Sequence, residues 1–215
     1  MPAIFPRWTN HIPTLIGLLA PLVGAGLIFG VWYWFSPNFT DVGYRPKQPV
    51  PYSHALHVGD IGLDCRYCHN TVESAPHAAV PPTATCMNCH SQVKAESPRL
   101  EKVRESFNTG KPVEWVRVHQ LPDYVFFDHR PHVAAGVGCV SCHGRVDEAA
   151  EIRLEQPLSM TWCLDCHRDP EPNLRPLDQV TNMAWDAAEH DYDPKTDPNR
   201  KRQVNPPIHC SGCHR

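Results

Sequence analysis

The arrangement of the cysteines constrains this chain more strongly than any other feature of its sequence. All 10 cysteines of the 215 residues fall in CxxC pairs, and a histidine follows each pair directly. At this spacing two thiols can bond to the edge of one porphyrin while the histidine reaches its iron, which makes CxxCH the attachment signature of c-type haem. In chain order, the motifs are Cys65/Cys68/His69, Cys86/Cys89/His90, Cys139/Cys142/His143, Cys163/Cys166/His167 and Cys210/Cys213/His214. The sequence therefore predicts five covalently bound haem c groups.

Structural zinc and thiol redox chemistry are the alternatives for paired cysteines. Zinc knuckles need four ligands per ion and have no use for a histidine directly after each second cysteine. Redox CxxC pairs occur in a thioredoxin-like βαβ setting, for which this sequence shows no pattern. Because the motifs use every cysteine, the haem interpretation also predicts a fold without disulfides.

The N-terminal region contains one long apolar segment. Ile12 to Phe35 is an uncharged run of 24 residues, which as a helix spans about 36 Å and is long enough to cross a bilayer. Its last four residues, Trp32 to Phe35, have the composition of an interfacial aromatic belt. The alternative is a cleaved signal peptide with small residues at Gly24 to Gly26 as its cleavage site. Because the apolar run continues nine residues past that site, we favour an uncleaved transmembrane anchor over residues 12–35.

Covalent haem attachment predicts the compartment. Haems of the c type are assembled outside the cytoplasm, so we expect the soluble part on the periplasmic or extracellular side of the inner membrane. Residues 1–11 then form a short cytoplasmic tail, residues 36–50 a proline-rich tether and residues 51–215 a periplasmic pentahaem domain. The balance of 20 basic against 23 acidic residues offers no footprint for nucleic acid.

The soluble part is predicted to be mostly irregular, with short helices, little sheet and a core packed around haem. Twenty-three prolines and short apolar runs oppose long helices and a broad sheet. One helix is well marked, with Ser97 as its N-cap, Pro98 at its first position and an end between Asn108 and Gly110. A short strand is predicted from Val113 to Val118.

The chain contains an internal repeat. Residues 52–69, YSHALHVGDIGLDCRYCH, align with residues 127–143, FDHRPHVAAGVGCVSCH, and the first copy has one extra residue in its glycine-containing turn. A second CxxCH follows each copy. The chain therefore divides into two dihaem modules, at about residues 50–95 and 125–170, and a C-terminal fifth haem.

Each copy of the repeat carries an HxxH pair ahead of its first CxxCH. The pairs are His54 with His57 and His129 with His132. A low-spin haem iron takes one ligand from its CxxCH histidine and a sixth ligand from elsewhere. Side chains three apart on a helical turn share one face at different heights, so one pair can serve two irons. The alternative is that these are exposed histidines, which the recurrence of the pair opposes.

HxxH ahead of CxxCH resembles the class III multihaem cytochromes c, the cytochrome c3 and c7 type. In that family the first histidine of the pair binds the nearest haem and the second binds another. Carried over to this sequence, the resemblance pairs His54 with His69, His57 with His90, His129 with His143, and His132 with His167.

A closer resemblance covers nearly the whole chain. The stretches VPPTATCMNCHSQ, WVRVHQLPDYVFFDHRPHVAAGVGCVSCHGRVD and PLSMTWCLDCHRDPEPNLRP, behind a single anchor helix, resemble the pentahaem cytochrome c subunit of bacterial alternative complex III. The resemblance implies a respiratory membrane complex that oxidises menaquinol. In it, this subunit takes electrons from an iron–sulfur subunit, beside other membrane subunits. It passes them to a monohaem cytochrome, a copper protein or a terminal oxidase.

The fifth haem lacks an HxxH pair. In the class III pattern a residue just before a middle CxxCH binds the last haem, and here Met160 holds that place in PLSMTWC. Methionine is an axial ligand that raises the potential relative to two histidines, although it can also be a core residue that fills a gap. His119, in VRVHQLP, competes for the same iron.

Three functions fit these motifs. The first is an electron relay that is no enzyme on its own, in which every iron has six ligands. The second is a multihaem reductase that keeps one iron open for a substrate, and the third is a stand-alone quinol dehydrogenase. The relay is favoured because the spare ligands equal or outnumber the haems and no CxxCH departs from the standard form.

Overall fold

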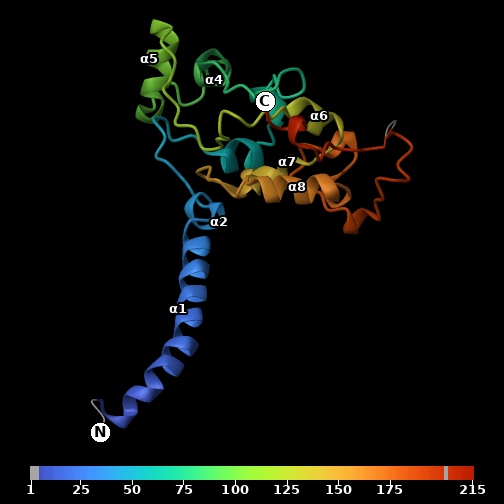
Figure 1. Ribbon diagram of the computed structural model, residues 1–215. Coiled ribbons are helices and arrows are strands. Elements are labelled where there is room, and N and C mark those ends of the chain that lie inside the picture. Colours follow the sequence, from blue (N-terminus) through green and yellow to red (C-terminus); the bar gives the residue numbers. More distant parts are fainter. Residues whose placement is uncertain (1–4, 201–202) are drawn as a thin grey trace. The chain divides into compact units, whose positions relative to one another are not determined.

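The computed structural model describes residues 5–200 and 203–215. The chain forms two compact units, the first ending at Asp41 and the second comprising Val42–Arg215 (Figure 1). The second unit contains short helices and 3-10 turns, and its described residues hold two isolated β-bridges, Val125 with His214 and Val137 with Leu174, in place of a sheet. The prediction of a mostly irregular fold with short helices is therefore confirmed.

The first unit is dominated by α1 (Ile12–Trp34). A 3-10 turn, η1 (Arg7–His11), precedes α1, and α2 (Pro37–Thr40) follows it. Proline near the start of α1 is compatible with a helix because the first turn has no N–H partner to lose. None of its apolar stretch is buried, and the helix is long and apolar enough to cross a membrane. Length and composition alone fit a membrane anchor and a signal sequence equally.

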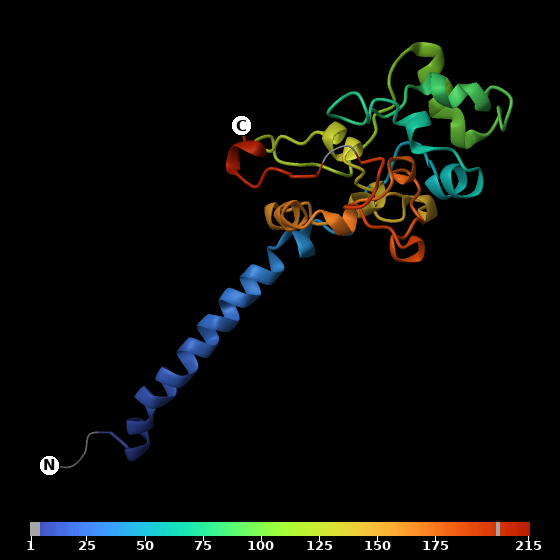
Figure 2. The same ribbon diagram turned by 90° about the vertical axis from the view of Figure 1, so that its right-hand side faces the viewer.

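The second unit begins with extended chain and continues through short elements. In order they are η2 (Ala55–Asp60), α3 (Cys65–Cys68), α4 (Thr83–His90), η3 (Pro98–Leu100), α5 (Glu101–Thr109), α6 (His129–Ala134), α7 (Cys139–His143), η4 (Val146–Glu148), α8 (Met160–Arg168), η5 (Glu171–Asn173), η6 (Leu177–Gln179), η7 (Ala188–His190) and η8 (Cys210–Gly212). Figures 1 and 2 show α4 and α5 side by side at one end of this unit, with α6, α7 and α8 grouped away from them.

The polypeptide alone builds only a thin core in this unit. Within the described residues no large side chain is completely buried. The buried apolar side chains are Val50, Val103, Leu154, Leu174, Val180, Met183 and Trp185. A domain of this length normally buries many more apolar groups, so a large apolar group other than side chains is needed to complete the core.

The helix predicted after Ser97 is present. Pro98 opens a 3-10 turn, α5 continues to Thr109, and Gly110 ends it in the left-handed conformation at φ 74°. Val103 is buried on the face that packs against α4, whereas Phe107 remains half exposed. The predicted strand from Val113 to Val118 is wrong.

In the 113–118 segment the backbone of one residue hydrogen-bonds to a side chain and not to a partner strand. The side-chain amide of Gln48 donates to the Val116 carbonyl at 2.8 Å, and its oxygen accepts from the Val116 N–H at 3.0 Å. One glutamine thus satisfies the backbone groups that strand pairing would otherwise need.

The two copies of the repeat differ in the type of helical turn that carries the HxxH pair, in keeping with their difference of one residue in length. In the second copy the HxxH pair lies on the α-helix α6, whereas in the first copy His54 precedes a π-helical turn, η2. A π-turn holds one residue more than an α-turn, so it absorbs the extra residue of the first copy. Both copies then turn at a glycine with positive φ, Gly62 at 79° and Gly136 at 83°.

Candidate haem-binding sites

The CxxCH motifs lie on short helices that place both thiols on one face. The first and third motifs form α3 and α7, the second and fourth end α4 and α8, and the fifth lies on the turn η8. Residues three apart on a helical turn are neighbours, so each cysteine pair can reach one porphyrin edge. All ten cysteines are free thiols. Asp64 caps α3 by accepting from the Arg66 N–H at 2.8 Å, which fixes where the first motif starts.

Two of the motif cysteines are more exposed than the other eight. Cys89 of the second motif and Cys210 of the fifth are exposed, whereas the other eight motif cysteines are half-buried. Cys89 lies in the last turn of α4, and α4 packs mainly against α5 at one end of the unit, so little polypeptide covers this thiol. A porphyrin bound at the second motif would cover this thiol.

Each HxxH pair is held around one aromatic ring. In the first copy the Tyr52 ring centre lies 4.7 Å from that of His54 and 4.4 Å from that of His57. In the second copy the Phe127 ring centre lies 4.8 Å from His129 and 4.7 Å from His132. The aromatic residue that opens both copies of the repeat therefore holds both histidines in place.

The structure brings the predicted histidine partners together. Ring centres lie 6.1 Å apart for His57 and His90, 6.1 Å apart for His132 and His167, and 6.4 Å apart for His129 and His143. With metal–imidazole bonds of about 2 Å, two imidazoles on opposite sides of one ion have ring centres about 6 Å apart. These three separations match the spacing of two axial ligands on one metal ion.

The fourth predicted pair, His54 and His69, is also close. Burial lowers the pKa of the His54 imidazole to about 4, and the neighbouring His69 and His57 rings add to this shift. The neutral form that the low pKa favours is the form that binds a metal. His54 Nδ1 is buried and has no hydrogen-bond partner among the described residues.

Backbone carbonyls orient most of these rings. A carbonyl oxygen only accepts, so a ring whose Nδ1 contacts one carries its proton there and keeps Nε2 free for a metal. Seven Nδ1–carbonyl contacts of this kind occur: His57 to Ser53 at 2.8 Å, His69 to Ala79 at 2.8 Å, His90 to Val93 at 2.9 Å, His129 to Pro76 at 2.9 Å, His132 to Asp128 at 2.7 Å, His167 to Pro207 at 2.7 Å and His214 to Tyr124 at 3.3 Å.

His143 has a different partner. Its Nδ1 lies 3.2 Å from Nε2 of His119, and the two ring centres are 4.5 Å apart. Burial lowers the pKa of His143 to about 3, with His119 and His129 as further causes. The structure thus places His119 beside the third motif, which sequence reasoning did not foresee because 24 residues separate the two histidines.

Cysteines of different motifs lie close to one another. The Cys139 thiol lowers the pKa of Cys65, and the Cys65 thiol raises the pKa of Cys139, so the first and third motifs are neighbours. Burial, then the Cys166 and Cys163 thiols, raise the pKa of Cys142 to about 12. The pKa of Cys163 is in turn raised by burial and then by Cys213. The attachment points therefore form a connected series.

The first and second motifs join the same series through their thiols. Burial raises the pKa of Cys68, and the Cys86 thiol of the second motif is the next cause. The His57 and His90 ring centres lie 6.1 Å apart, which also places the first copy of the repeat beside the second motif.

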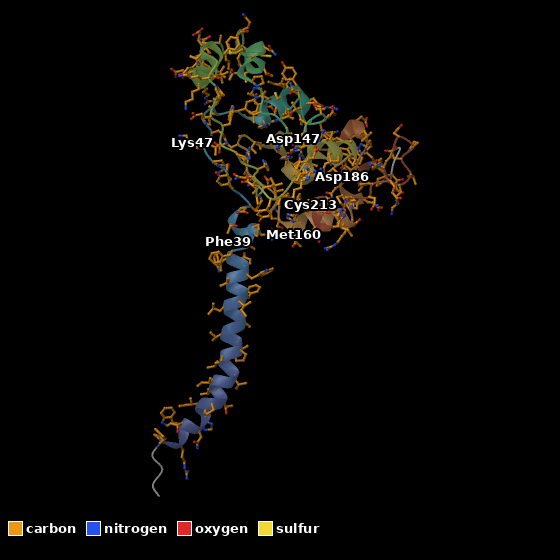
Figure 3. The ribbon with its side chains drawn as sticks, turned by 45° about the horizontal axis from the view of Figure 1, so that its top comes forward. Phe39, Lys47, Asp147, Met160, Asp186 and Cys213 are labelled. Carbon is orange, nitrogen blue, oxygen red and sulfur yellow. The ribbon has the colours of Figure 1, made fainter. Side chains whose placement is uncertain are left out.

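The fifth motif is held by the segment that leads into the second repeat. Phe126 donates its N–H to the Cys213 carbonyl at 2.7 Å, and His214 forms a β-bridge with Val125. Two apolar side chains beside it are exposed, Tyr124 at 63% and Ile208 at 61%. Met160 opens α8 one turn before Cys163; Figure 3 labels it and Cys213. Exposed apolar groups at a CxxCH suit a site that a porphyrin covers.

Two arginines, the buried Arg175 and the half-buried Arg200, flank the third motif and were missed by sequence reasoning. The Arg175 side chain packs over the Gly138 backbone and under the Trp185 ring, 5.2 Å from the ring centre. Nη1 of Arg175 donates to the Asn182 carbonyl at 2.7 Å, and Nη2 of Arg200 donates to the Arg175 carbonyl at 3.2 Å. The Nε atoms of both arginines are buried without a partner in the described part of the chain. Buried guanidinium groups pair with carboxylates, and porphyrin carboxylates supply that chemistry.

The residues present fit haem c as a group. The free thiol pairs match the edge of the porphyrin, and the imidazole pairs about 6 Å apart match its iron. The buried guanidinium Nε atoms without a partner in the described residues match its carboxylates, and the thin polypeptide core matches its apolar faces. No cluster of histidine, cysteine or carboxylate groups suited to a bare metal ion is found in the described residues.

Comparisons with known proteins identify the family. The family model described as cytochrome c7 and related cytochrome c matches residues 50–109 and 125–215, which is more than half of the chain. A relative from Nitratidesulfovibrio vulgaris (strain Hildenborough), described as "Menaquinone reductase, multiheme cytochrome c subunit", is 38% identical over 133 residues, or 61% of this chain. The chain spans 58% of that relative's length. The chain therefore belongs to the family of cytochrome c7 and related cytochromes c, whose members carry covalently bound haem.

Proposed function

We propose that this chain is a membrane-anchored five-haem electron relay within a respiratory complex that exchanges electrons with menaquinone. The observation that carries the proposal is the spacing of the histidine rings. Three partner pairs lie 6.1–6.4 Å apart, at the separation of two axial ligands on one iron. A relay needs irons with two protein ligands, because an open iron invites substrate.

Each residue type has a defined task in this proposal. The ten motif cysteines, the exposed Cys89 included, fix the porphyrins, and the five motif histidines provide one axial ligand each. His54, His57, His129 and His132 provide the second axial ligand at the first, second, third and fourth motifs, respectively. Bound haem c supplies reversible one-electron chemistry at its iron. The carbonyl contacts at Nδ1 hold the rings in the tautomer that binds metal.

Met160 is the proposed sixth ligand of the fifth haem. It lies on α8 one turn before Cys163, whose thiol neighbours Cys213 of the fifth motif. Its 65% exposure gives the sulfur freedom to reach a group seated on the fifth motif. His119, the competing candidate, has its Nε2 engaged at His143. A methionine ligand would give this haem a higher potential than its neighbours.

The contacts between motifs support an order for the relay. The His57–His90 pair links the first and second sites, and the Cys65–Cys139 thiol contact links the first and third. The third and fourth motifs meet through their thiols, and His167 contacts Pro207 just before the fifth. The proposed order is second, first, third, fourth, fifth. The second and fifth sites are then the two ends, where donor and acceptor would dock.

The setting of the relay follows from α1 and from the resemblance to alternative complex III. We propose that residues 12–35 anchor the chain with its N-terminus inside, residues 36–50 tether it, and residues 51–215 carry the haems outside. The partners are an iron–sulfur subunit, membrane subunits and a monohaem cytochrome, with a copper protein or terminal oxidase as alternative acceptors. Neighbouring subunits carry the quinone chemistry.

A second direction of electron flow is favoured by the relative. That protein is described as a subunit of a menaquinone reductase, so this chain could deliver electrons to menaquinone instead of receiving them from menaquinol. Purifying the complex by a tag on this chain and adding menaquinol separates the two. Rapid haem reduction by menaquinol supports the oxidising direction. The other direction is supported if menaquinol leaves the haems oxidised, and if the haems reduce menaquinone once they are supplied with electrons.

The relay itself is tested on the full-length chain produced with a haem c maturation system. We expect five haems per chain by pyridine haemochrome assay, and low-spin signals alone in the oxidised state. A high-spin signal with rapid cyanide or nitrite binding would replace the relay with a reductase. Menaquinol oxidation by the isolated chain would instead support a stand-alone quinol dehydrogenase.

A further inference from the structure

His143 differs from the other CxxCH histidines in what holds its ring. The Nδ1 atoms of His69, His90, His167 and His214 all face backbone carbonyls. Nδ1 of His143 faces a side chain, Nε2 of His119, at 3.2 Å. The third motif is therefore the one CxxCH of the described chain whose ring orientation depends on another titratable residue.

We propose that His119 is a positioning residue for the third haem, accepting a hydrogen bond from Nδ1–H of His143. The inference rests on the proposed function, because it assumes that His143 binds iron through Nε2. It assigns to His119 a role behind the motif histidine, away from the iron, in place of the axial role at the fifth haem that the sequence left open.

The geometry around His143 supports this role from both sides. The His129 ring lies 6.4 Å from the His143 ring and at 9° to it, at the spacing of the opposite axial ligand. The His119 ring lies at 4.5 Å and 73° to His143, as expected for a ring whose nitrogen points at the edge of another. His143 thus has one histidine across the metal position and a different one at its Nδ1.

The chemistry of the two acceptors explains why the partner matters. An imidazole nitrogen is a more basic acceptor than a backbone carbonyl, so it draws the Nδ1 proton more strongly and makes Nε2 a stronger donor to iron. A stronger donor stabilises ferric over ferrous iron. His119 therefore lowers the potential of the third haem, which occupies the middle of the proposed relay order.

Substitution of His119 in the haem-loaded full chain tests the proposal. His119→Phe removes the acceptor, His119→Gln restores one through its amide oxygen, and His77→Gln alters an exposed histidine elsewhere as the control. We expect His119→Phe to shift the ferrous-to-ferric ratio of one haem about tenfold, or about 59 mV upward for a one-electron couple. His119→Gln should recover part of the shift.

Two readouts make the test decisive. Spectroelectrochemical titration gives the potentials, and electron paramagnetic resonance gives the g values of each low-spin ferric haem; one haem should change and four should not. Identical potentials and g values in His119→Phe and the His77→Gln control would overturn the proposal.

A density map of the wild-type chain covers the case in which His119→Phe fails to load haem. The map should show His119 Nε2 within hydrogen-bond distance of His143 Nδ1. His119 bound to any iron would refute the inference. Wild-type chain without low-spin haem signals would instead refute the proposed function, so the two failures are distinguishable.

Discussion

Replacing His132 by alanine should open one iron and leave the other haems unchanged. The His132 ring faces His167 with 6.1 Å between ring centres, and its Nδ1 contacts the Asp128 carbonyl at 2.7 Å. With bonds of about 2 Å on each side, that gap holds one metal ion and nothing more. Alanine ends the side chain at Cβ, far short of the ion, so the iron at His167 would lack its sixth ligand.

The expected magnitude follows from the number of motifs. One of the five CxxCH sites loses its sixth ligand, so about one fifth of the ferric haem should become high-spin and bind cyanide. The lost Asp128 hydrogen bond contributes about 1 kcal/mol, which a haem-loaded fold should tolerate. Electron paramagnetic resonance with integrated high-spin and low-spin signals measures this fraction.

The control is His77→Ala, at an exposed position outside the predicted ligands. It should keep every haem low-spin. The reasoning is refuted if His132→Ala stays fully low-spin with all five haems bound, because His167 would then have a different partner. A high-spin share of two fifths or more would show that His132 positions more than one site.

Three further predictions follow from other parts of the second unit. Met160→His should keep the fifth haem low-spin but lower its potential, since methionine ligation raises it; an unchanged redox titration would remove Met160 from the ligand set. Gly138→Ala should cost about 1–3 kcal/mol of unfolding free energy, because the new Cβ would overlap the Arg175 guanidinium; a Tm within a degree of wild type would contradict that packing. Asp64→Ala should cost about 1 kcal/mol at pH 7 by removing the cap of α3. Arg66 lowers the pKa of Asp64 from 3.8 to about 2, so this carboxylate stabilises the fold above pH 3.8 and its contribution is lost as the pH falls through about 2. Denaturation at pH 7 and pH 3 should show a smaller difference in unfolding free energy between wild type and Asp64→Ala at pH 3. An equal difference at both pH values would show that the charge of Asp64 does not stabilise the fold.

The repeat explains why much of the site was predictable from sequence. The repeat marked the HxxH pairs, because each copy has an aromatic residue, a histidine pair and a CxxCH at nearly constant spacing. The resemblance to the class III multihaem cytochromes c then named the partners of His57, His129 and His132. In the structure the ring centres of these partners lie 6.1–6.4 Å apart. It adds that the aromatic residue clamps both histidines, and that a π-turn absorbs the extra residue of the first copy.

The unpredicted features come from irregular chain. His119 reaches His143 through a segment without regular structure, so no periodicity marks the contact. Arg175 lies behind the fourth motif in a stretch of turns, and only the fold shows it buried at 6% exposure against Gly138. The false strand near Val116 has a related cause, because alternating apolar residues predict a strand but a distant Gln48 takes its hydrogen bonds.

The exposure of Cys89 was also beyond sequence reasoning. Its motif has the same letters as the other four, so the pattern alone assigns all ten thiols the same surroundings. Burial depends instead on how much chain packs around each motif, and α4 has mainly α5 beside it.

An experimental density map of the haem-loaded chain tests the central claim most directly, because it shows the two axial ligands of every iron. The account predicts five irons, each with its CxxCH histidine. Opposite that histidine we expect His54, His57, His129, His132 and Met160 at the first, second, third, fourth and fifth motifs, respectively. An iron with a vacant or water-filled sixth position, or an HxxH histidine turned away from every haem, would contradict the account.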